Sequence, residues 1–551
     1  MRRVVVIGGT GAFGARLVEG LLATTDLGVV IAARRPEPAQ ELANRLRERH
    51  PGGRIDAHAL DTGRLTADAL RALDAWCVID AAGPFQGAPA RVAEAAIAAG
   101  CHYVDIADAR DFVAAFPRLD ETARNAKVLA VTGASSTPGL SQAVLDDLTC
   151  GWQRIDAIEI AISPGNRQPR GLSVVSAILA GAGQPVRVFR NGAWAEAHGW
   201  GLLVRRRMPG LGSRWLSLVA TPDLDLVVER FKPQRDAIFR AGLELSLLHL
   251  GLAALSKLVA AGFVRNLVPL ARPLRWTSER FRPWGSGRGG MTVVARGCDA
   301  SGQAAVSTWA LVAQEDGPNI PVLPALAIVR ALHEGRLTRT GAMPCAGVLP
   351  LADIAREFAR FRITTRRWVQ PTRLFRRALG RSFDALPKAI QNGHGVDDRL
   401  ILEGRASVAG AASAVGRILA RLIGFPPISA DVPVKVEMRA DQDGEVWTRT
   451  FGRHTFRSRL APLPGRRAHV SERFGVLTFC LELRAGPTGL DLVIVGWRLG
   501  PIRLPRRLAP RSHATERIDA AGRFCFDVPI ALPGIGLLVH YRGWLVPTAQ
   551  P

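Results

Sequence analysis

A glycine-rich turn directly after a short apolar run constrains the fold of this chain most strongly. Residues 4–7 read Val-Val-Val-Ile, as expected for a buried parallel strand, and a helical apolar pattern runs from Ala15 to Leu22. Between them stands Gly9-x-Gly11-x-x-Gly14, whose glycines permit, in that order, a tight turn, approach of a pyrophosphate and close helix–strand packing. The pattern predicts a dinucleotide-binding unit. Its expected cofactor-binding residues are Gly8, Gly9, Thr10, Gly11, Ala12, Phe13 and Gly14.

The first 150 residues continue this alternation of strands and helices. Further apolar runs of strand length lie at residues 29–32, 55–60, 77–80, 102–106 and 128–131. Segments with helical spacing separate them, which is the pattern of a doubly wound parallel sheet with right-handed crossovers. We therefore predict that residues 1–150 form a Rossmann domain of the α/β class.

The end of the second predicted strand bears on the choice of cofactor. An NAD site normally places an acidic residue there to bind the ribose 2′-hydroxyl, whereas this chain has Arg34 and Arg35. Two guanidinium groups suit a 2′-phosphate, because they form forked, charge-assisted hydrogen bonds with it. We predict NADP(H) as the preferred cofactor. NAD(H) stays the alternative, since the chain is rich in arginine and the pair could be ordinary surface charge.

Two further segments follow predicted strands at the same edge of the sheet. Asp61 comes after the third strand, where a residue commonly borders the adenine, and a solvated turn aspartate is the alternative reading. Ala82, Gly83 and Pro84 come after the fourth strand, at the edge where the nicotinamide end of a dinucleotide lies. We predict that all four residues contact the cofactor.

Residues 151–365 have a different pattern, which predicts an α+β domain for binding substrate or for dimerisation. The segments with strand-like alternation are 155–162, 291–295 and 306–313. An apolar segment at 242–264 has the length of a membrane span, but Glu244, His249 and Lys257 interrupt it, each at a high cost in a bilayer. We predict no transmembrane span there, but a long helix with a wide apolar face.

The rest of the chain, residues 366–551, is predicted to be a β-rich domain that follows an exposed linker at 363–367. Its expected strands are 434–438, 446–451, 475–483, 490–497, 524–529 and 537–544. Their spacing predicts a curved sheet, a sandwich or an open barrel. Trp447, Arg449 and Phe451 alternate along one strand, and an interior lined this way would suit an amphipathic or lipid-like ligand. Ordinary sheet packing is the simpler reading.

Several segments resemble the saccharopine dehydrogenase (NADP-binding) superfamily. They are the glycine loop, AAGPFQG from Ala81, CHYVDIAD from Cys101, SSTPG from Ser135, GRGGM from Gly287 and GPNIP from Gly317. The resemblance covers about residues 1–350. It implies a Rossmann domain and then an α+β domain whose last helix returns to the cofactor domain, but it does not imply saccharopine as the substrate. The C-terminal region resembles an uncharacterised bacterial domain that is fused to such reductase-like halves.

The sequence excludes the tyrosine–lysine mechanism of the short-chain dehydrogenases. That mechanism needs a lysine four residues after a tyrosine, but Tyr103 is followed at this spacing by Ala107, and Tyr541 by Leu545. Tyr103 and Asp105 share one face of a predicted strand and are the candidates for ordering cofactor or substrate. A core tyrosine with a capping aspartate is the alternative. The seven cysteines show no Cys-x-x-Cys spacing, so no metal site is predicted.

Together these features favour an NADP(H)-dependent oxidoreductase with a small-molecule substrate, either lipid-like or acidic. The alternative is a non-catalytic NADP(H)-binding or redox-sensing protein associated with a lipid surface. The net charge of +24 comes almost wholly from arginines spread along the chain, so nucleic acid is not an expected partner. A strand begins at once, which leaves no room for a signal peptide. We expect a cytoplasmic protein, with contact to the inner face of the membrane and homodimer formation left open.

Overall fold

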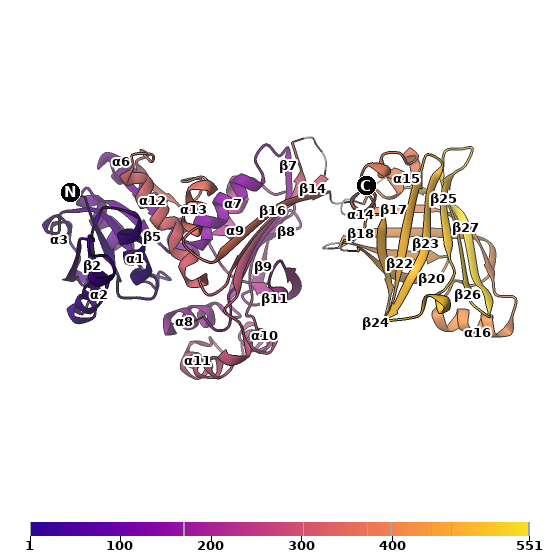
Figure 1. Cartoon of the computed structure of the whole chain (residues 1–551), viewed down its shortest axis with the longest axis horizontal. Coiled ribbons are helices and arrows are strands. Elements are labelled where there is room, and N and C mark those ends of the chain that lie inside the picture. The colour runs from indigo at the N-terminus through magenta and orange to yellow at the C-terminus, as the bar shows by residue number, and fades with distance from the viewer. Residues whose placement is uncertain are drawn as a thin grey trace. The chain divides into compact units, whose positions relative to one another are not determined.

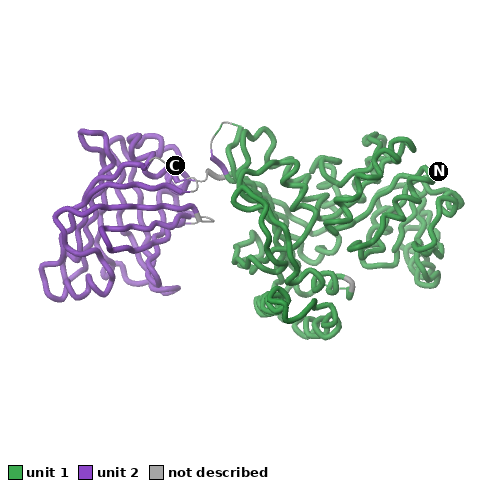
Figure 2. The backbone as a smooth tube through the Cα atoms, turned by 180° about the vertical axis from the view of Figure 1, so that it is seen from behind, with its two compact units in different colours: residues 1–302, 306–369 green, residues 303–305, 370–551 purple. Residues whose placement is uncertain are grey.

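A computed structural model describes residues 2–168, 171–300, 302, 304–371, 373–396, 399–441, 444–463 and 465–548. The chain divides into two compact units (Figure 2). Unit 1 comprises residues 1–302 and 306–369, and unit 2 comprises residues 303–305 and 370–551. Unit 1 contains two sheets, and unit 2 contains one closed barrel.

Unit 1 begins with a seven-stranded parallel sheet in the order β15-β6-β5-β4-β1-β2-β3 (Figure 1). Its strands are β1 (Arg3–Ile7), β2 (Gly28–Ala33), β3 (Ile55–Ala59), β4 (Ala75–Asp80), β5 (His102–Asp105), β6 (Leu129–Thr132) and β15 (Gly341–Pro344). Its helices are α1 (Gly14–Thr24), α2 (Pro36–Arg49), α3 (Ala67–Ala72), α4 (Arg91–Ala98), α5 (Arg110–Ala115) and α6 (Asp120–Asn125). Apolar runs fill the central strands because helices cover both faces of the sheet. The predicted Rossmann fold is confirmed.

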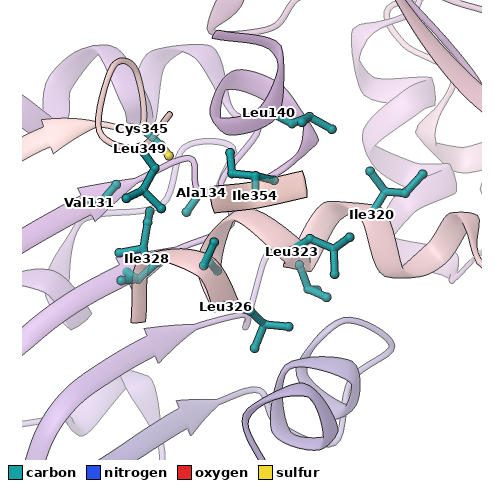
Figure 3. Packing of buried hydrophobic residues seen from close by; sticks show 14 of the residues in the cluster. Val131, Ala134, Leu140, Ile320, Leu323, Leu326, Ile328, Cys345, Leu349 and Ile354 are labelled. Atoms are coloured by element: carbon teal, nitrogen blue, oxygen red, sulfur yellow. The ribbon is translucent and has the colours of Figure 1, made fainter. Parts of the chain in front are cut away.

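The seventh strand comes from far outside the first 150 residues. After the second sheet the chain returns as α12 (Leu323–His333) and β15, and β15 pairs in parallel with β6. Helix α12 is buried on nearly all sides, and Leu326 packs against Gly20 of α1, where an added Cβ would lie 2.5 Å from a Leu326 methyl group. Figure 3 shows Leu326 and Ile328 of α12 within this core. The return to the cofactor domain agrees with the resemblance, and a boundary at residue 150 leaves out one strand of the sheet.

A mixed sheet follows in unit 1, in the order β10-β11-β12-β7-β13-β14-β16. Its strands are β7 (Arg154–Ser163), β10 (Val204–Met208), β11 (Gly212–Leu218), β12 (Asp236–Ala241), β13 (Gly289–Cys298), β14 (Ala304–Ala313) and β16 (Ile363–Pro371), with the hairpin β8 (Pro185–Arg190) and β9 (Ala193–His198) beside β12. Its helices are α7 (Ser141–Leu148), α8 (Leu172–Gly181), α9 (Asp223–Phe231), α10 (Ser246–Ala260), α11 (Ala271–Arg280) and α13 (Leu351–Phe358). The α+β prediction is thus confirmed, but the linker predicted at 363–367 is wrong, because these residues belong to the edge strand β16.

The apolar segment at 242–264 forms a shorter helix than the hydrophobic pattern predicts. Only Ser246–Ala260 is helical, and its buried face includes His249, which contacts the Ser217 hydroxyl at 3.0 Å. Glu244 precedes the helix and accepts hydrogen bonds from the backbone N–H groups of Asn166 and Ser286. Glu244 and His249 are therefore paired within the protein, and Lys257 is exposed on the helix surface. In the part of the chain that the structure describes, no helix is long and apolar enough to cross a membrane.

Unit 2 is an antiparallel barrel of ten strands, closed by pairing between β22 and β23. The strands are β17 (Arg399–Gly410), β18 (Ser429–Asp441), β19 (Gly444–Phe451), β20 (His454–Pro462), β21 (His469–Phe474), β22 (Leu477–Gly486), β23 (Gly489–Leu499), β25 (His513–Ile518), β26 (Phe524–Leu532) and β27 (Gly536–Pro547), with β24 (Ile502–Arg503) as a short addition to β23. The predicted β-rich domain is confirmed, but the barrel is closed rather than open. Closure leaves no free edge among these ten strands.

Three helices accompany the barrel. Helices α14 (Leu374–Leu379) and α15 (Lys388–Gly393) precede β17, and α16 (Ala414–Ile423) connects β17 to β18. Since α15 leads into the start of β17 and α16 leaves its end, the helices stand at opposite ends of the barrel (Figure 1).

Candidate functional site

The loop between β1 and α1 is shaped by two glycines that touch the backbone. Gly8 has a φ of +71°, and a Cβ added there would lie 2.9 Å from backbone atoms of Ala82. At Gly14 an added Cβ would lie 2.1 Å from the carbonyl oxygen of Gly8. Neither position admits a side chain without movement of the loop. The left-handed residue of the turn is Gly8, not Gly9, to which the sequence pattern assigned the tight turn.

Gly11 differs from these two glycines because it faces open space. It is exposed, and the Gly8 carbonyl oxygen, at 3.1 Å, is the one atom near an added Cβ. Thr10 and Ala12 are also exposed, while Phe13 is half-buried against the core. The loop therefore presents backbone to solvent immediately before a helix N-terminus, where free N–H groups favour an anion. This cradle fits the pyrophosphate of a dinucleotide.

Arg34 and Arg35 lie beside the glycine loop. Strand β2 is the direct neighbour of β1, and the Gly8 N–H donates to the Ala32 carbonyl at 3.0 Å. Both arginines are exposed, and neither forms a hydrogen bond or ion pair with any residue that the structure describes. Two unpaired guanidinium groups thus stand next to the cradle, on the side where β2 ends.

The other predicted contacts lie on the flanking loops. Strand β4 is the other neighbour of β1, and the Ala81 N–H donates to the Ile7 carbonyl at 3.0 Å, so the exposed segment from Ala82 to Pro84 adjoins the glycine loop. Asp61 is exposed, and its carboxylate accepts from the Gly63 N–H at 3.0 Å. The structure brings the predicted cofactor residues to one edge of the sheet, with Asp61 engaged in its own turn.

Tyr103 and Asp105 lie inside the protein. Tyr103 is buried and stacks on Phe116, with a distance of 5.8 Å between ring centroids. Asp105 is fully buried, and its carboxylate accepts from the N–H groups of Ala107 and Gly133 and from the Thr132 hydroxyl. Tyr103 therefore occupies a core position, and Asp105 holds together the loops that follow β5 and β6.

Two buried carboxyl groups stand side by side below this edge. Asp80 ends β4 and Asp105 ends β5, and the two residues are paired in register. Burial raises the pKa of Asp80 to about 6 and the pKa of Asp105 to about 7. No sequence pattern indicates these pKa shifts, because they arise from burial, which the fold determines.

The Asp105→Asn variant is expected to remove a pH dependence of stability. Because the folded-state pKa of about 7 lies above the ordinary value of 3.8, the folded protein keeps a proton that the unfolded chain has lost. Stability therefore falls as the pH rises from about 3.8 to about 7, and it levels off above that pH. Asparagine keeps one oxygen as acceptor and removes the charge, so the melting temperature of the variant should fall less between pH 5 and pH 8. At most about 3 kcal/mol of the loss is removed, since about two pH units below 7 contribute roughly 1.4 kcal/mol each. Asp111→Asn, at an exposed aspartate, is the control. Parallel melting curves for Asp105→Asn and wild type would contradict this account.

A buried network joining the SSTPG segment to the second sheet was not predicted. Asp223, the first residue of α9, is buried and accepts hydrogen bonds from Thr137, Ser141 and Gln142. Gln142 in turn accepts from Arg230 at 2.8 Å. Thr137 therefore bonds to another element instead of capping its own helix, and the site edge is fixed to the second sheet. An aspartate at a helix start gave the only sequence signal.

The β1–β2–β4 edge is that of a Rossmann dinucleotide-binding protein. Residues 4–132 match the model of the saccharopine dehydrogenase NADP binding domain, and residues 386–545 match a domain of unknown function. The chain thus carries an NADP-binding domain of the saccharopine dehydrogenase type, fused to a β-rich C-terminal domain, as the motifs predict. NADP(H) is the cofactor that this match supports. No curated protein sequence matches the chain.

Solved structures with similarity to the chain include several dehydrogenases and reductases. Saccharopine dehydrogenase (L-Glu forming) from Saccharomyces cerevisiae is 13% identical, covering 67% of this chain and 100% of its own, with a TM-score of 0.49. A mutant meso-dapdh with DAP from Clostridium tetani is 14% identical, covering 65% and 99%, with a TM-score of 0.33. An alternative dihydrofolate reductase from Brucella suis in complex with NADP is 17% identical, covering 24% and 73%, with a TM-score of 0.21.

Proposed function

We propose that this protein is an NADP(H)-dependent oxidoreductase that acts on a small molecule at the carboxyl edge of the Rossmann sheet. The observation that carries the proposal is the convergence of three features at this edge. They are the backbone cradle around Gly11, the unpaired arginines Arg34 and Arg35, and the exposed loop from Ala82 to Pro84. The match of residues 4–132 to an NADP binding domain agrees with it.

Each feature has a distinct part in holding the cofactor. The N–H groups around Gly11 would bind the pyrophosphate, and Arg34 and Arg35 would bind the 2′-phosphate of the adenosine. The segment from Ala82 to Pro84 would lie along the nicotinamide half, anchored by Phe85, whose ring packs on Phe112 at 5.3 Å. The bound cofactor supplies hydride chemistry, while this chain supplies binding, orientation and a covered site.

The test is single-turnover oxidation of bound NADPH in the presence of a panel of carbonyl, imine and enoyl compounds. We expect one compound class to oxidise NADPH at least about 100 times faster than buffer does, a modest acceleration for an enzyme. The same panel with a variant that cannot bind NADPH is the control. Unchanged NADPH across a broad panel, despite tight binding, favours the second candidate, a non-catalytic NADP(H) sensor. The burial of both Tyr103 and Asp105 is the observation that favours that candidate.

A lipid surface is proposed as a partner of unit 1, because helices α10 and α11, and the short segments that follow each of them, expose large apolar side chains. These include Leu247, Leu258, Phe263, Trp276 and Trp284, of which Phe263 is 80% and Trp284 is 72% exposed. The exposed cations among them are Lys257, Arg265, Arg272, Arg280 and Arg282. Aromatic rings beside cations are typical of segments that lie in an anionic membrane interface.

Liposome flotation tests this contact. We expect the protein to float with phosphatidylserine-containing vesicles at low salt, and Phe263→Ser with Trp284→Ser to reduce the bound fraction at least about fivefold through lost apolar burial. Val174→Ser, at an apolar residue of α8 that is only 38% exposed, is the matched control. Flotation that is absent at low salt, or equal in the double variant, would remove this partner.

A further inference from the structure

The burial of inward-facing side chains changes along the axis of the barrel. At the end where α14 and α15 stand, the interior is filled. Inward side chains that are 4% exposed or less there include Leu402, Met438, Leu460, Leu483 and Leu490. Phe375 of α14 and Ile390 of α15 are completely buried in the same cluster. The two helices therefore fill the middle of this end, although a few inward side chains at its rim, such as Leu400 and Leu492, are partly exposed.

At the opposite end, where α16 stands, the inward side chains fall into two groups. Four of them are 3% exposed or less and lie on the adjoining strands β17, β18, β19 and β27, namely Val408, Val434, Phe451 and Val539. The other inward side chains at this end remain partly exposed. They pack against the interior cluster without being buried, and they include Val432, Phe456, Phe479, Val528 and Ile530. Strands β20, β22 and β26 thus have partly exposed inward side chains toward this end, whereas β17, β19 and β27 are filled here too. We call this partly exposed side of the interior, lined by these five residues, the cup.

The number of strands explains the partly exposed side. Eight strands enclose an interior that side chains can just fill, and the diameter grows with each added strand. A closed barrel of ten strands therefore needs additional material inside it. Here α14 and α15 supply that material at one end, whereas the buried residue of α16 is Gly416, which has no side chain to place in the interior.

The floor of the cup carries a polar cluster. Arg449 donates to the Ser458 hydroxyl at 2.7 Å and to Glu472 at 3.0 Å, and the Ser458 hydroxyl donates to the same carboxylate at 2.7 Å. The guanidinium of Arg449 lies 4.7 Å from the Trp447 ring centroid and 5.8 Å from that of Phe456. The side chains of Arg449 and Glu472 are 13% and 14% exposed, so a few polar atoms stand below apolar walls.

Helix α16 exposes apolar side chains at the same end of the barrel. Val415, Ile418 and Leu422 follow helical spacing and are 58%, 60% and 78% exposed, with Arg417 and Arg421 between them. An apolar helix face beside a partly exposed apolar interior offers a hydrophobic ligand an apolar surface at the entrance to the barrel.

We propose that the cup binds one amphipathic lipid monomer, with its hydrocarbon part along the apolar walls and its polar end at Arg449 and Ser458. Apolar walls with a few convergent polar groups are the usual composition of a small-molecule pocket. The Ser458 hydroxyl already donates its proton to Glu472, so the Arg449 guanidinium is the donor for the ligand. The polar end must therefore carry an acceptor oxygen, either a carboxylate or a neutral carbonyl. The site lies wholly in unit 2 and does not depend on the proposed redox activity.

Fluorescence titration of the full-length protein with anthroyloxy-labelled palmitate tests the proposal. We expect saturable binding of one probe per chain, competed by unlabelled palmitate if the end group is a carboxylate and by monopalmitoylglycerol if it is a neutral carbonyl. Ile530→Trp fills the cup without adding a charge. It should weaken binding of the probe at least about 10-fold, because the indole ring occupies the volume that the hydrocarbon chain of the ligand needs. Arg449→Met should weaken binding of the preferred competitor by a similar factor, about 10-fold, because the charged hydrogen bond is lost.

Arg457→Gln is the matched control, because Arg457 lies on the same strand as Phe456 but points outward and is exposed. Its affinity for the probe should be within about twofold of that of the wild type, a free-energy difference well below the contribution of one hydrogen bond. The thermal unfolding transition of each variant is compared with that of the wild type, to show that the variant is folded. Wild-type protein that shows no saturable binding would overturn the proposal. A folded Ile530→Trp variant with unchanged affinity would also overturn it, and this variant decides the matter if Arg449→Met does not fold.

Discussion

Gly11→Val is expected to lower NADPH affinity at least about 100-fold, or about 3 kcal/mol, while the protein stays folded. An added Cβ at Gly11 points into open space, with only the Gly8 carbonyl oxygen at 3.1 Å, so the folded loop accommodates it at small cost. That open space is where the proposed pyrophosphate would lie, and the valine methyl groups would occupy it. Calorimetric titration with NADPH, beside a melting curve, measures both effects.

Two other glycine variants serve as controls for the effect of an added side chain on NADPH affinity and on stability. Gly52→Val, at an exposed glycine with no atom within 4 Å of an added Cβ, should change neither affinity nor stability. Gly14→Val should destabilise the protein, because its Cβ would lie 2.1 Å from the Gly8 carbonyl oxygen. Unchanged NADPH affinity in a folded Gly11→Val protein would mean that the cofactor does not cross this loop.

The double variant Arg34→Asp with Arg35→Ala is expected to lose about 100-fold in NADPH affinity, since each charge-assisted hydrogen bond is worth roughly 1.5–3 kcal/mol. NADH lacks the 2′-phosphate, so its affinity should change by less than about threefold, a fraction of one such bond. Both arginines are exposed and without partners among the described residues, so their loss removes no contact within the protein. Parallel titrations with the two dinucleotides measure the difference.

Arg45→Asp, at another exposed arginine on the neighbouring helix α2, controls for the replacement of a surface arginine by an aspartate. It should reduce NADPH affinity by less than about threefold, because a distant surface charge is screened. Equal losses for NADPH and NADH in the double variant would show that Arg34 and Arg35 do not read the 2′-phosphate.

The sequence predicted the parts of unit 1 in which local pattern and fold agree. The apolar run at Val4–Ile7, the glycines after it and the helix from Gly14 form one contiguous signal, and they fold as that signal predicts. Strand β15 gave no comparable signal, because it is four residues long and pairs with β6 across some 200 residues of intervening chain. The buried contacts of Asp223 were missed for the same reason, since its partners lie on other elements.

The limits of the prediction for unit 2 have a related cause. Alternating residues in β19 marked one face of a strand, and Trp447, Arg449 and Phe451 do point into one interior. Whether a sheet closes depends on pairing between its first and last strands, here β17 with β27, which no local pattern records. The run at 363–367 appeared to be a linker because of its charge, but it continues as a strand paired at the sheet edge.

The most direct test of the central claim is calorimetric titration of the full-length protein with NADPH and with NADH. We predict one NADPH bound per chain, with an affinity at least about 10-fold higher than that for NADH, the equivalent of one charged hydrogen bond. Binding of neither dinucleotide would contradict the assignment of the cradle around Gly11. Equal binding of both would contradict the role given to Arg34 and Arg35.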